Sequence, residues 1–211
     1  MLKLFYAPNA CSLASHIALE EAGAAFEAVR VNFAETEQRS AAYLEVNPKG
    51  RVPALVTDRG VITENPAILA YVAQSFPEAA LAPLDDPFAF AQAQDFNLYI
   101  AASLHVAYAH LFRPARYAQG EAAAQAMRAH APQAIGDHFE LIEQRFEDGR
   151  PWVHGDTYTI SDPYLFVMSR WLARDGVGNE GRFPKVLAHR ERMIQRPAVR
   201  KVLAREALPA I

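Results

Sequence analysis

Residues 51–65 read RVPALVTDRGVITEN, and this stretch restricts the fold of the first half of the chain most strongly. Two short apolar runs, residues 53–57 and 61–63, flank the tripeptide DRG at 58–60. This spacing predicts two antiparallel strands joined by a three-residue loop, with the glycine at the position that needs a positive φ. Pro53 cannot donate a ladder hydrogen bond and therefore belongs at the start or the edge of its strand.

The segments around this hairpin alternate between strand and helix signals. Short apolar or alternating runs predict strands, and apolar residues at helical spacing predict helices. In chain order we expect a strand at 2–6, a helix at 12–22, a strand around 29–33, a helix at 36–46, the hairpin, and a helix at 65–74. This order requires a right-handed parallel crossover followed by an antiparallel pair. We therefore predict an α/β, thioredoxin-like domain over residues 1–77, with a four-stranded mixed sheet.

After this domain the strand signals are absent. Residues 78–87 hold prolines and two aspartates, which is typical of a linker between domains. Residues 88–211 are expected to form an all-helical domain, with Pro132 kinking or dividing one long helix. The expected helices are 88–112, 121–147, 161–174, 184–195 and 197–206.

Composition excludes several classes of protein. The net charge of −3 and the scattered basic residues argue against a nucleic-acid partner. No window approaches the roughly 20 apolar residues of a membrane span, and the first residues lack the pattern of a signal peptide. Cys11 is the only cysteine, which excludes an intramolecular disulfide, a C-x-x-C dithiol and a cysteine-based zinc site. We expect a cytoplasmic protein that needs no metal and binds no membrane.

Cys11 is the first candidate for chemistry. It follows Pro8-Asn9-Ala10 and precedes a helix, where unpaired backbone N–H groups carry partial positive charge. Such a position can bring the pKa of a cysteine from about 8.5 down to between about 3.5 and 7.5, and the thiolate is the reactive form. The alternative is a buried, inert residue, because free cysteine is among the most buried residue types.

Two further segments can hold a peptide-like ligand. If the Val52–Pro53 bond is cis, the backbone of Val52 turns outward and can pair with an extended ligand, although only about 5–6% of X-Pro bonds are cis. At the start of the next helix, backbone N–H groups and the Asn65 side chain can bind a carboxylate, and Glu64 can pair with an ammonium group. Helix capping by Asn65 is the simpler interpretation. His105 lies inside a long helix, where a lone histidine is usually a core or surface residue without a catalytic role.

Two other patterns are structural or are rejected. Residues 159–162, TISD, have the spacing of a capping box ahead of an apolar run, which predicts the start of a helix. Residues 176–181, GVGNEG, match the letters of a dinucleotide fingerprint. No strand precedes them and Pro184 follows closely, so we reject that function.

Taken together, these segments resemble the bacterial beta-class glutathione transferases over essentially the full chain. The order and spacing of the matching strings are more specific than any single motif. They are FYAPNACS at 5–12, VNPKGRVPAL at 46–55, TENPAILAYV at 63–72, Leu104-His105 with LFRP at 111–114, and YTISDPYLF at 158–166. The resemblance implies a cytosolic glutathione transferase, an enzyme of detoxification with glutathione as its co-substrate.

The resemblance also implies roles for individual residues. Cys11 falls at the family's cysteine, which hydrogen-bonds to glutathione or forms a mixed disulfide with it. Val52, before a cis Pro53, falls at the backbone clamp on the cysteinyl part of the tripeptide. Glu64 and Asn65 fall where the family holds the γ-glutamyl group.

In the helical half, His105 matches a family histidine that reaches the active-site cleft. Two family lysines have no equivalent, because the loop at 34–39 lacks one and Val106 follows the histidine. A family asparagine is replaced by Leu98, with Asn97 one place earlier. The resemblance therefore assigns no residue to the glycine carboxylate of glutathione.

The implied reaction is conjugation of the glutathione thiolate to an electrophilic hydrophobic substrate, in a cleft lined by Tyr108, Leu111 and Phe112. Thiol–disulfide exchange or peroxide reduction through Cys11 is also chemically available. The alternatives are an isomerase, a reductive dehalogenase or an ether lyase on the same scaffold, and a non-catalytic binding or regulatory module. The stretch 88–112 is apolar over more than one face and the family pairs through this region, so we expect a homodimer.

Overall fold

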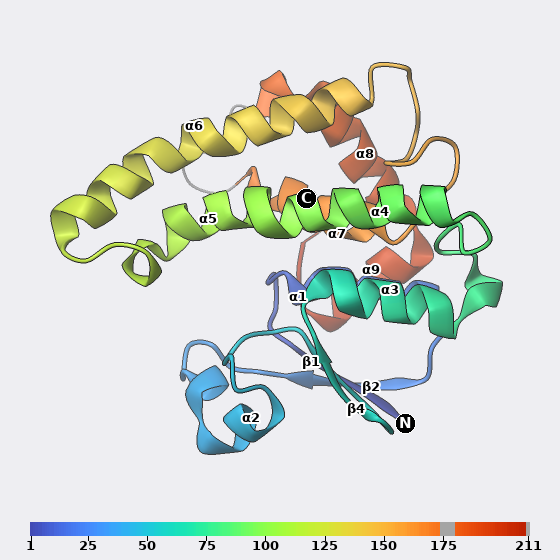
Figure 1. Cartoon of the computed structure of the whole chain (residues 1–211), viewed down its shortest axis with the longest axis horizontal. Helices are drawn as coiled ribbons and strands as arrows, with labels where there is room; N and C mark the ends of the chain where they lie inside the picture. Colours follow the sequence, from blue (N-terminus) through green and yellow to red (C-terminus); the bar gives the residue numbers. More distant parts are fainter. Residues whose placement is uncertain (174–179, 210–211) are drawn as a thin grey trace.

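Residues 1–75 form an α/β domain, in which helices pack on a sheet, as Figure 1 shows. The structure is a computed structural model that describes residues 1–173 and 180–209; most of the rejected GVGNEG segment lies outside these residues. The described residues form one sheet of four strands in the order β2-β1-β3-β4, with β1 and β2 parallel and the other pairs antiparallel. The predicted fold class is confirmed. The elements are β1 (Leu2–Tyr6), α1 (Ser12–Glu21), β2 (Phe26–Arg30), α2 (Ala41–Val46), β3 (Ala54–Thr57), β4 (Gly60–Thr63) and α3 (Asn65–Ser75).

Three local predictions for this domain are wrong in detail. β2 begins earlier than predicted and ends at Arg30, because its pairing with β1 ends there; of the alternating residues Val29, Val31 and Phe33, only Val29 lies in the strand. The predicted helix at 36–46 is a 3₁₀ turn followed by α2, which Ser40 caps by accepting a hydrogen bond from the Tyr43 N–H. The hairpin loop has two residues, because Gly60 pairs with Thr57; the φ of this glycine is 139°, a conformation that side-chain-bearing residues rarely adopt.

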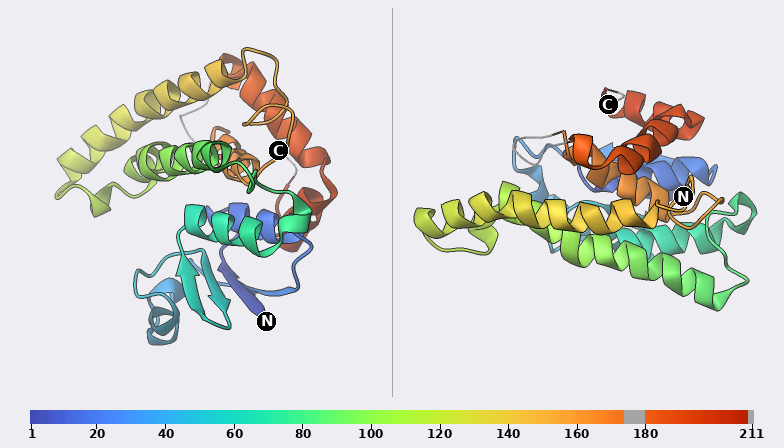
Figure 2. Two further views of the ribbon diagram at one scale, coloured as in Figure 1. Left: turned by 45° about the vertical axis from the view of Figure 1, so that its right-hand side comes forward. Right: turned by 90° about the horizontal axis from the view of Figure 1, so that it is seen from above.

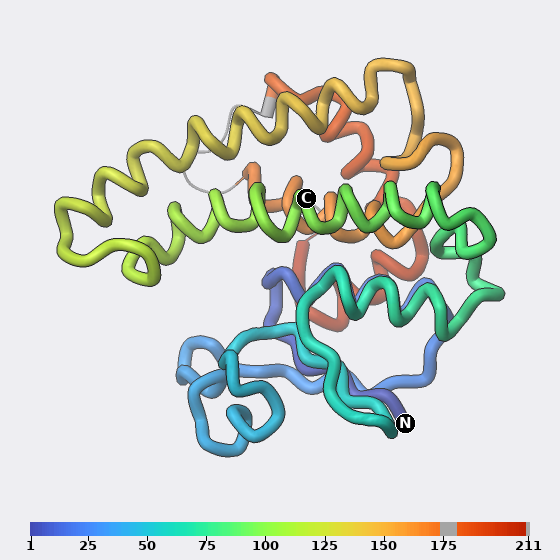
Figure 3. The backbone as a smooth tube through the Cα atoms, viewed as in Figure 1, coloured from blue at the N-terminus to red at the C-terminus, as the bar shows by residue number. Residues whose placement is uncertain are grey.

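The second half is helical in the residues that the structure describes, apart from an isolated bridge between Trp152 and Gly155. One continuous helical run, residues 87–112, contains a π-helical segment and lies antiparallel to α6 (Figure 3). Pro132 was expected to kink or divide its helix; it lies inside α6, which continues from Glu121 to Arg145, so it does not divide the helix. The helices are α4 (Pro87–Tyr99), the π-helical segment Ile100–Leu104, α5 (His105–Phe112), α6 (Glu121–Arg145), α7 (Ser161–Trp171), α8 (Pro184–Gln195) and α9 (Pro197–Arg205).

The two halves share one hydrophobic core. α1 and α3 lie between the sheet and the helical domain (Figure 1), and α1 packs against both α7 and α9. Figure 2 shows α9, at the end of the chain, returning to the N-terminal domain. Every residue of α7 is buried, which fits a central helix that is covered on all sides. This packing fixes the start of α1, and therefore Cys11, against the helical half.

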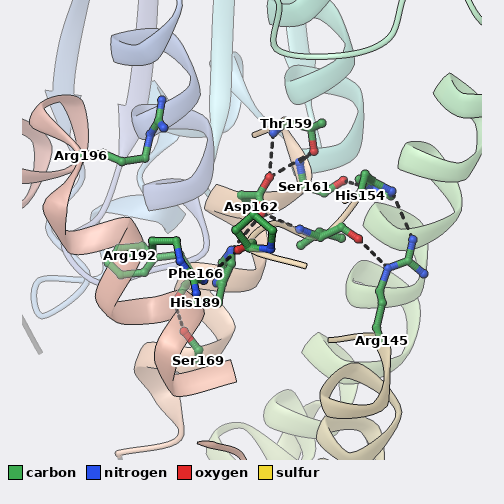
Figure 4. Close-up of polar contacts among 12 residues, drawn as sticks. Arg145, His154, Thr159, Ser161, Asp162, Phe166, Ser169, His189, Arg192 and Arg196 are labelled. Atoms are coloured by element: carbon green, nitrogen blue, oxygen red, sulfur yellow. Dashed lines mark hydrogen bonds and ion pairs between the residues drawn. The ribbon is translucent and has the colours of Figure 1, made fainter. Parts of the chain in front are cut away.

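The start of α7 has one of the two hydrogen bonds of the predicted capping box, because the Thr159 hydroxyl accepts from the Ser161 N–H rather than from the Asp162 N–H. The carboxylate of Asp162 accepts hydrogen bonds from the N–H of Thr159 (2.7 Å) and the N–H of Val153 (2.9 Å). Nε2 of His189, on α8, lies 2.9 Å from the same carboxylate, and all of these groups are buried (Figure 4). One acidic side chain therefore joins the loop before α7, the start of α7 itself, and α8.

Candidate active site

A single cavity between the two domains brings the expected site residues together. It has a volume of about 510 Å³ and opens between the first turn of α1, the loop before β3, the start of α3 and the α4–α5 run. The site residues that line it are Cys11, Val52, Pro53, Glu64, Asn65 and His105. They come from four segments that are far apart in the sequence, so their convergence depends on the fold.

Local hydrogen bonds position Cys11 at the first turn of α1. The hydroxyl of Ser12 bonds to both the N–H and the carbonyl of Ala7, which closes the loop before the helix. The Asn65 side chain donates to the carbonyl of Cys11 (2.8 Å). The Cys11 thiol donates to the carbonyl of Val52, with a Sγ–O distance of 3.3 Å. The thiol therefore points across the cavity to the loop that precedes β3.

The electrostatics of Cys11 reverse the expectation from sequence. Burial, followed by the negative charge of Glu64, raises the pKa of the thiol to about 12. Backbone N–H groups at the helix start lower the pKa, as expected, and so does the cation of Arg51, but both by less than burial raises it. Burial disfavours the thiolate more than one helix terminus stabilises it. Cys11 is thus a protonated thiol, a hydrogen-bond donor, at neutral pH.

The Val52–Pro53 peptide bond is cis, as the resemblance implies. The preceding carbonyl, that of Arg51, accepts hydrogen bonds from the Tyr43 hydroxyl (2.7 Å) and the Asn47 side chain (2.6 Å). These contacts hold the loop in place and leave the backbone of Val52 beside the thiol of Cys11.

Glu64 and Asn65 connect β4 to α3 in an unusual conformation. The φ of Glu64 is 72°, a value that non-glycine residues rarely adopt and that is found most often at functional sites. Its carboxylate pairs with Lys49 Nζ at 2.6 Å and is half exposed. The Asn65 side chain is buried and used within the chain, because its carbonyl oxygen accepts from Ser15 Oγ (2.6 Å) and its amide donates to Cys11. We therefore expect Asn65 to contact a ligand through its backbone N–H.

His105 enters the cavity from the helical domain, where the π-helical segment gives way to α5. A π-helical turn shifts the residues that follow it around the helix axis and is frequent at functional sites. Burial, with the positive charges of Arg51 and Arg116, lowers the pKa of His105 to about 4. The imidazole packs at 5.5 Å from the Trp171 ring and is neutral at pH 7. It can donate one hydrogen bond but carries no charge.

Aromatic and basic side chains also line the cavity. Of the three residues that the sequence placed here, Tyr108 and Phe112 line the cavity, whereas Leu111 packs against the core instead. Sequence reasoning missed other lining side chains, because they come from loops and from helices distant in the chain. These are Phe33, Arg51, Arg113, Arg116, Tyr117, Tyr164 and Trp171.

Two kinds of feature are absent from the described residues. No group of three or more His, Cys, Asp or Glu side chains is placed to hold a metal ion within residues 1–173 and 180–209. Within the same residues, no helix is both long and apolar enough to cross a membrane.

The chain thus has a thioredoxin-like domain, in which a cis-proline loop faces a cysteine, and a helical domain on the other side of the cavity. Each of these domains matches a family model. The models are the glutathione S-transferase N-terminal domain at residues 1–74 and the C-terminal domain at residues 107–206. Glutathione S-transferase GstA of Escherichia coli O157:H7 is 36% identical over 98% of this chain and 100% of its own.

Solved structures of glutathione transferases are also similar to this chain. A glutathione transferase homologue from Sulfitobacter, with bound glutathione, is 39% identical with a TM-score of 0.92 over 99% of both chains. A bacterial beta-class glutathione S-transferase from Sphingomonas chungbukensis is 38% identical, with a TM-score of 0.85 over 98% of this chain and 100% of its own. The chain belongs to the glutathione S-transferase family and is a bacterial glutathione transferase.

Proposed function

We propose that this enzyme conjugates the thiolate of glutathione to electrophilic, largely apolar substrates in the cavity between its domains. The observation that carries the proposal is the convergence of the Cys11 thiol, the Val52 backbone, the Glu64 carboxylate and the His105 imidazole on one cavity. The bound glutathione in the Sulfitobacter homologue supports the same co-substrate.

The N-terminal domain supplies complementary groups for each part of the tripeptide. The N–H and carbonyl of Val52, beside the cis bond at the cavity, pair with the backbone of the cysteinyl residue. Glu64 binds the ammonium of the γ-glutamyl group and shares its charge with Lys49. The Asn65 N–H, at the positive end of α3, binds the neighbouring carboxylate.

Cys11 and His105 act as donors to sulfur in this scheme, because neither carries a charge at neutral pH. Hydrogen bonds aimed at the glutathione sulfur stabilise its thiolate over the thiol. The thiolate attacks the electrophilic carbon, the C–S bond forms, and the leaving group departs with its bonding electrons. The proton of the glutathione thiol passes to solvent.

Glu64→Gln should weaken glutathione binding by about 10-fold to 100-fold while the fold is retained. The variant keeps the shape of the side chain and removes a charge-assisted hydrogen bond, worth roughly 1.5–3 kcal/mol. Titration calorimetry with glutathione measures the dissociation constant. Glu45→Gln, an exposed glutamate on α2 outside the cavity, is the matched control and should bind like the wild type. An unchanged dissociation constant in Glu64→Gln would move the γ-glutamyl site elsewhere.

The proposal includes a homodimer. Phe96, Ile100 and Tyr108 of the apolar 88–112 stretch are buried in the chain's own core, but Phe88 is 73% exposed and Leu98 54% exposed. Val61 on the edge strand β4 is also exposed. A second copy of the chain would cover these side chains. Asn97 is buried and cannot reach a partner, so any contact at this place falls to Leu98.

Sedimentation equilibrium at micromolar protein should give the mass of two 23.4 kDa chains. Phe88→Ser should shift the equilibrium toward the single chain, because it removes an exposed apolar side chain from the proposed interface. Leu141→Ser, an equally exposed apolar position on α6, is the control and should leave the mass unchanged. A wild-type mass of one chain would refute the dimer.

A further inference from the structure

Three arginines line the cavity with little acid to balance them. Arg51 belongs to the loop before β3, whereas Arg113 and Arg116 follow α5. Glu64 is the only acidic side chain among the described lining residues, and it is already paired with Lys49. None of the three arginines has an ion pair with a described residue. The chain as a whole carries a net charge of −3, so the cluster is not part of a general excess of basic residues.

Several arginines elsewhere in the described chain are paired with carboxylates, and others, such as Arg145 and Arg192, donate to backbone carbonyls. Arg196 binds Glu21 through two nitrogens, Arg150 binds Asp148, and Arg128 binds Glu121. At the cavity, by contrast, burial and the nearby positive charges of Arg113, Arg51 and Arg39 lower the pKa of Arg116. Like charges held together without a counter-charge are unfavourable, and an anionic ligand relieves that repulsion.

Glutathione does not account for all of this charge. Its ammonium is assigned to Glu64 and its γ-glutamyl carboxylate to the start of α3, which leaves one carboxylate for a cation. Arg51 directly precedes Val52 and belongs to the domain that holds the tripeptide. Arg113 and Arg116 belong to the helical domain and remain without an anion.

The surroundings of these two arginines indicate the shape of what they bind. The Arg113 guanidinium lies over the Phe33 ring, at 5.9 Å from its centroid, and so bridges the two domains. Phe112 and Tyr117 line the same part of the cavity and are more than a third exposed. Flat aromatic surface beside guanidinium groups suits a planar apolar body that carries an oxyanion.

We infer that the electrophilic co-substrate carries a carboxylate or another oxyanion on an aromatic or similarly apolar body, and that Arg113 and Arg116 bind this anion. The inference rests on the proposed conjugation for its place in the reaction, but the anion site itself can be tested by binding alone. Conjugation of such a substrate replaces a leaving group: in 4-chloro-3,5-dinitrobenzoate the C–S bond forms at carbon 4, and chloride leaves with the bonding electrons.

The binding test compares two probes that have no leaving group, 3,5-dinitrobenzoate and 3,5-dinitrobenzamide, by calorimetry with saturating glutathione. The wild type should bind the benzoate about tenfold more tightly than the benzamide, the ratio expected of one charge-assisted contact. The double variant Arg113→Gln/Arg116→Gln should bring the two affinities to within about twofold. Both side chains are exposed, so the variant is expected to fold. Arg59→Gln, on the β3–β4 turn, is the control and should keep the wild-type preference.

Two outcomes would overturn the inference. One is equal affinity of the wild type for benzoate and benzamide. The other is a double variant that keeps the benzoate preference and binds glutathione more weakly, which would assign both arginines to glutathione. A parallel assay with 4-chloro-3,5-dinitrobenzoate and 4-chloro-3,5-dinitrobenzamide separates the two proposals: no conjugation of either acceptor, with the benzoate preference in binding intact, would refute the conjugation and leave the anion site standing.

Discussion

Cys11 of the unliganded enzyme should react with iodoacetamide at least ~50-fold more slowly at pH 7 than an unperturbed thiol. Its pKa of about 12, against an ordinary value of 9.0, makes the thiolate about a thousandfold scarcer. The greater nucleophilicity of a more basic thiolate recovers only about 20-fold of this loss. Mass spectrometry of the alkylated peptide measures the rate, and denatured protein supplies the reference thiol.

The pH dependence tests the cause of this slow reaction. The rate should rise about tenfold per pH unit from pH 7 to beyond pH 10, where an ordinary thiol has levelled off. Glu64→Gln should accelerate the reaction, because the charge of Glu64 is the second cause of the raised pKa. Formation of a mixed disulfide with oxidised glutathione should follow the same pH profile. A rate that levels off below pH 8 would show instead that the helix start stabilises the thiolate.

Asp162→Ala should destabilise the enzyme by about 4 kcal/mol or more. The variant leaves the buried N–H groups of Val153 and Thr159, and the facing Nε2 of His189, without an acceptor. Each unsatisfied buried donor costs roughly 1–3 kcal/mol, and a domain is stable by only about 5–15 kcal/mol in total. Urea unfolding followed by circular dichroism measures the loss.

The matched control for this prediction is Asp156→Ala, an exposed aspartate in the same loop, which should change the free energy of unfolding by less than about 0.5 kcal/mol. Equal midpoints for Asp162→Ala and the wild type would show that water satisfies these donors and that the capping box contributes little.

The order of strands and helices was predictable because periodicity and turn residues are local properties. The hairpin at Gly60, the parallel crossover and the long helices all follow from patterns of a few residues. Their boundaries were less predictable: β2 ends where its pairing with β1 ends, and Pro132 is tolerated inside α6 because the surrounding helix packing outweighs one lost hydrogen bond. Tertiary contacts decide such details.

In the candidate site, too, local features were predictable and features that depend on tertiary contacts were not. The resemblance identified Cys11 and other residues that line the cavity, but the direction of the pKa shift of Cys11 could not be predicted. That shift depends on how deeply the thiol is buried, and its burial depends on segments from both domains. For the same reason the sequence could not show that Ser15 and Cys11 already occupy the Asn65 side chain. Arg113 lies inside the matching LFRP string and Arg116 just after it, yet only the fold shows that they line the same cavity as Arg51.

The most direct test of the account is the initial rate of thioether formation from glutathione and 1-chloro-2,4-dinitrobenzene, followed by absorbance with the purified enzyme. The account predicts a rate well above the uncatalysed one that saturates with glutathione, and a higher KM for glutathione in Glu64→Gln. Glutathione binding by calorimetry, together with a conjugation rate equal to that of buffer for this acceptor and for 4-chloro-3,5-dinitrobenzoate, would contradict it and identify a binding module instead.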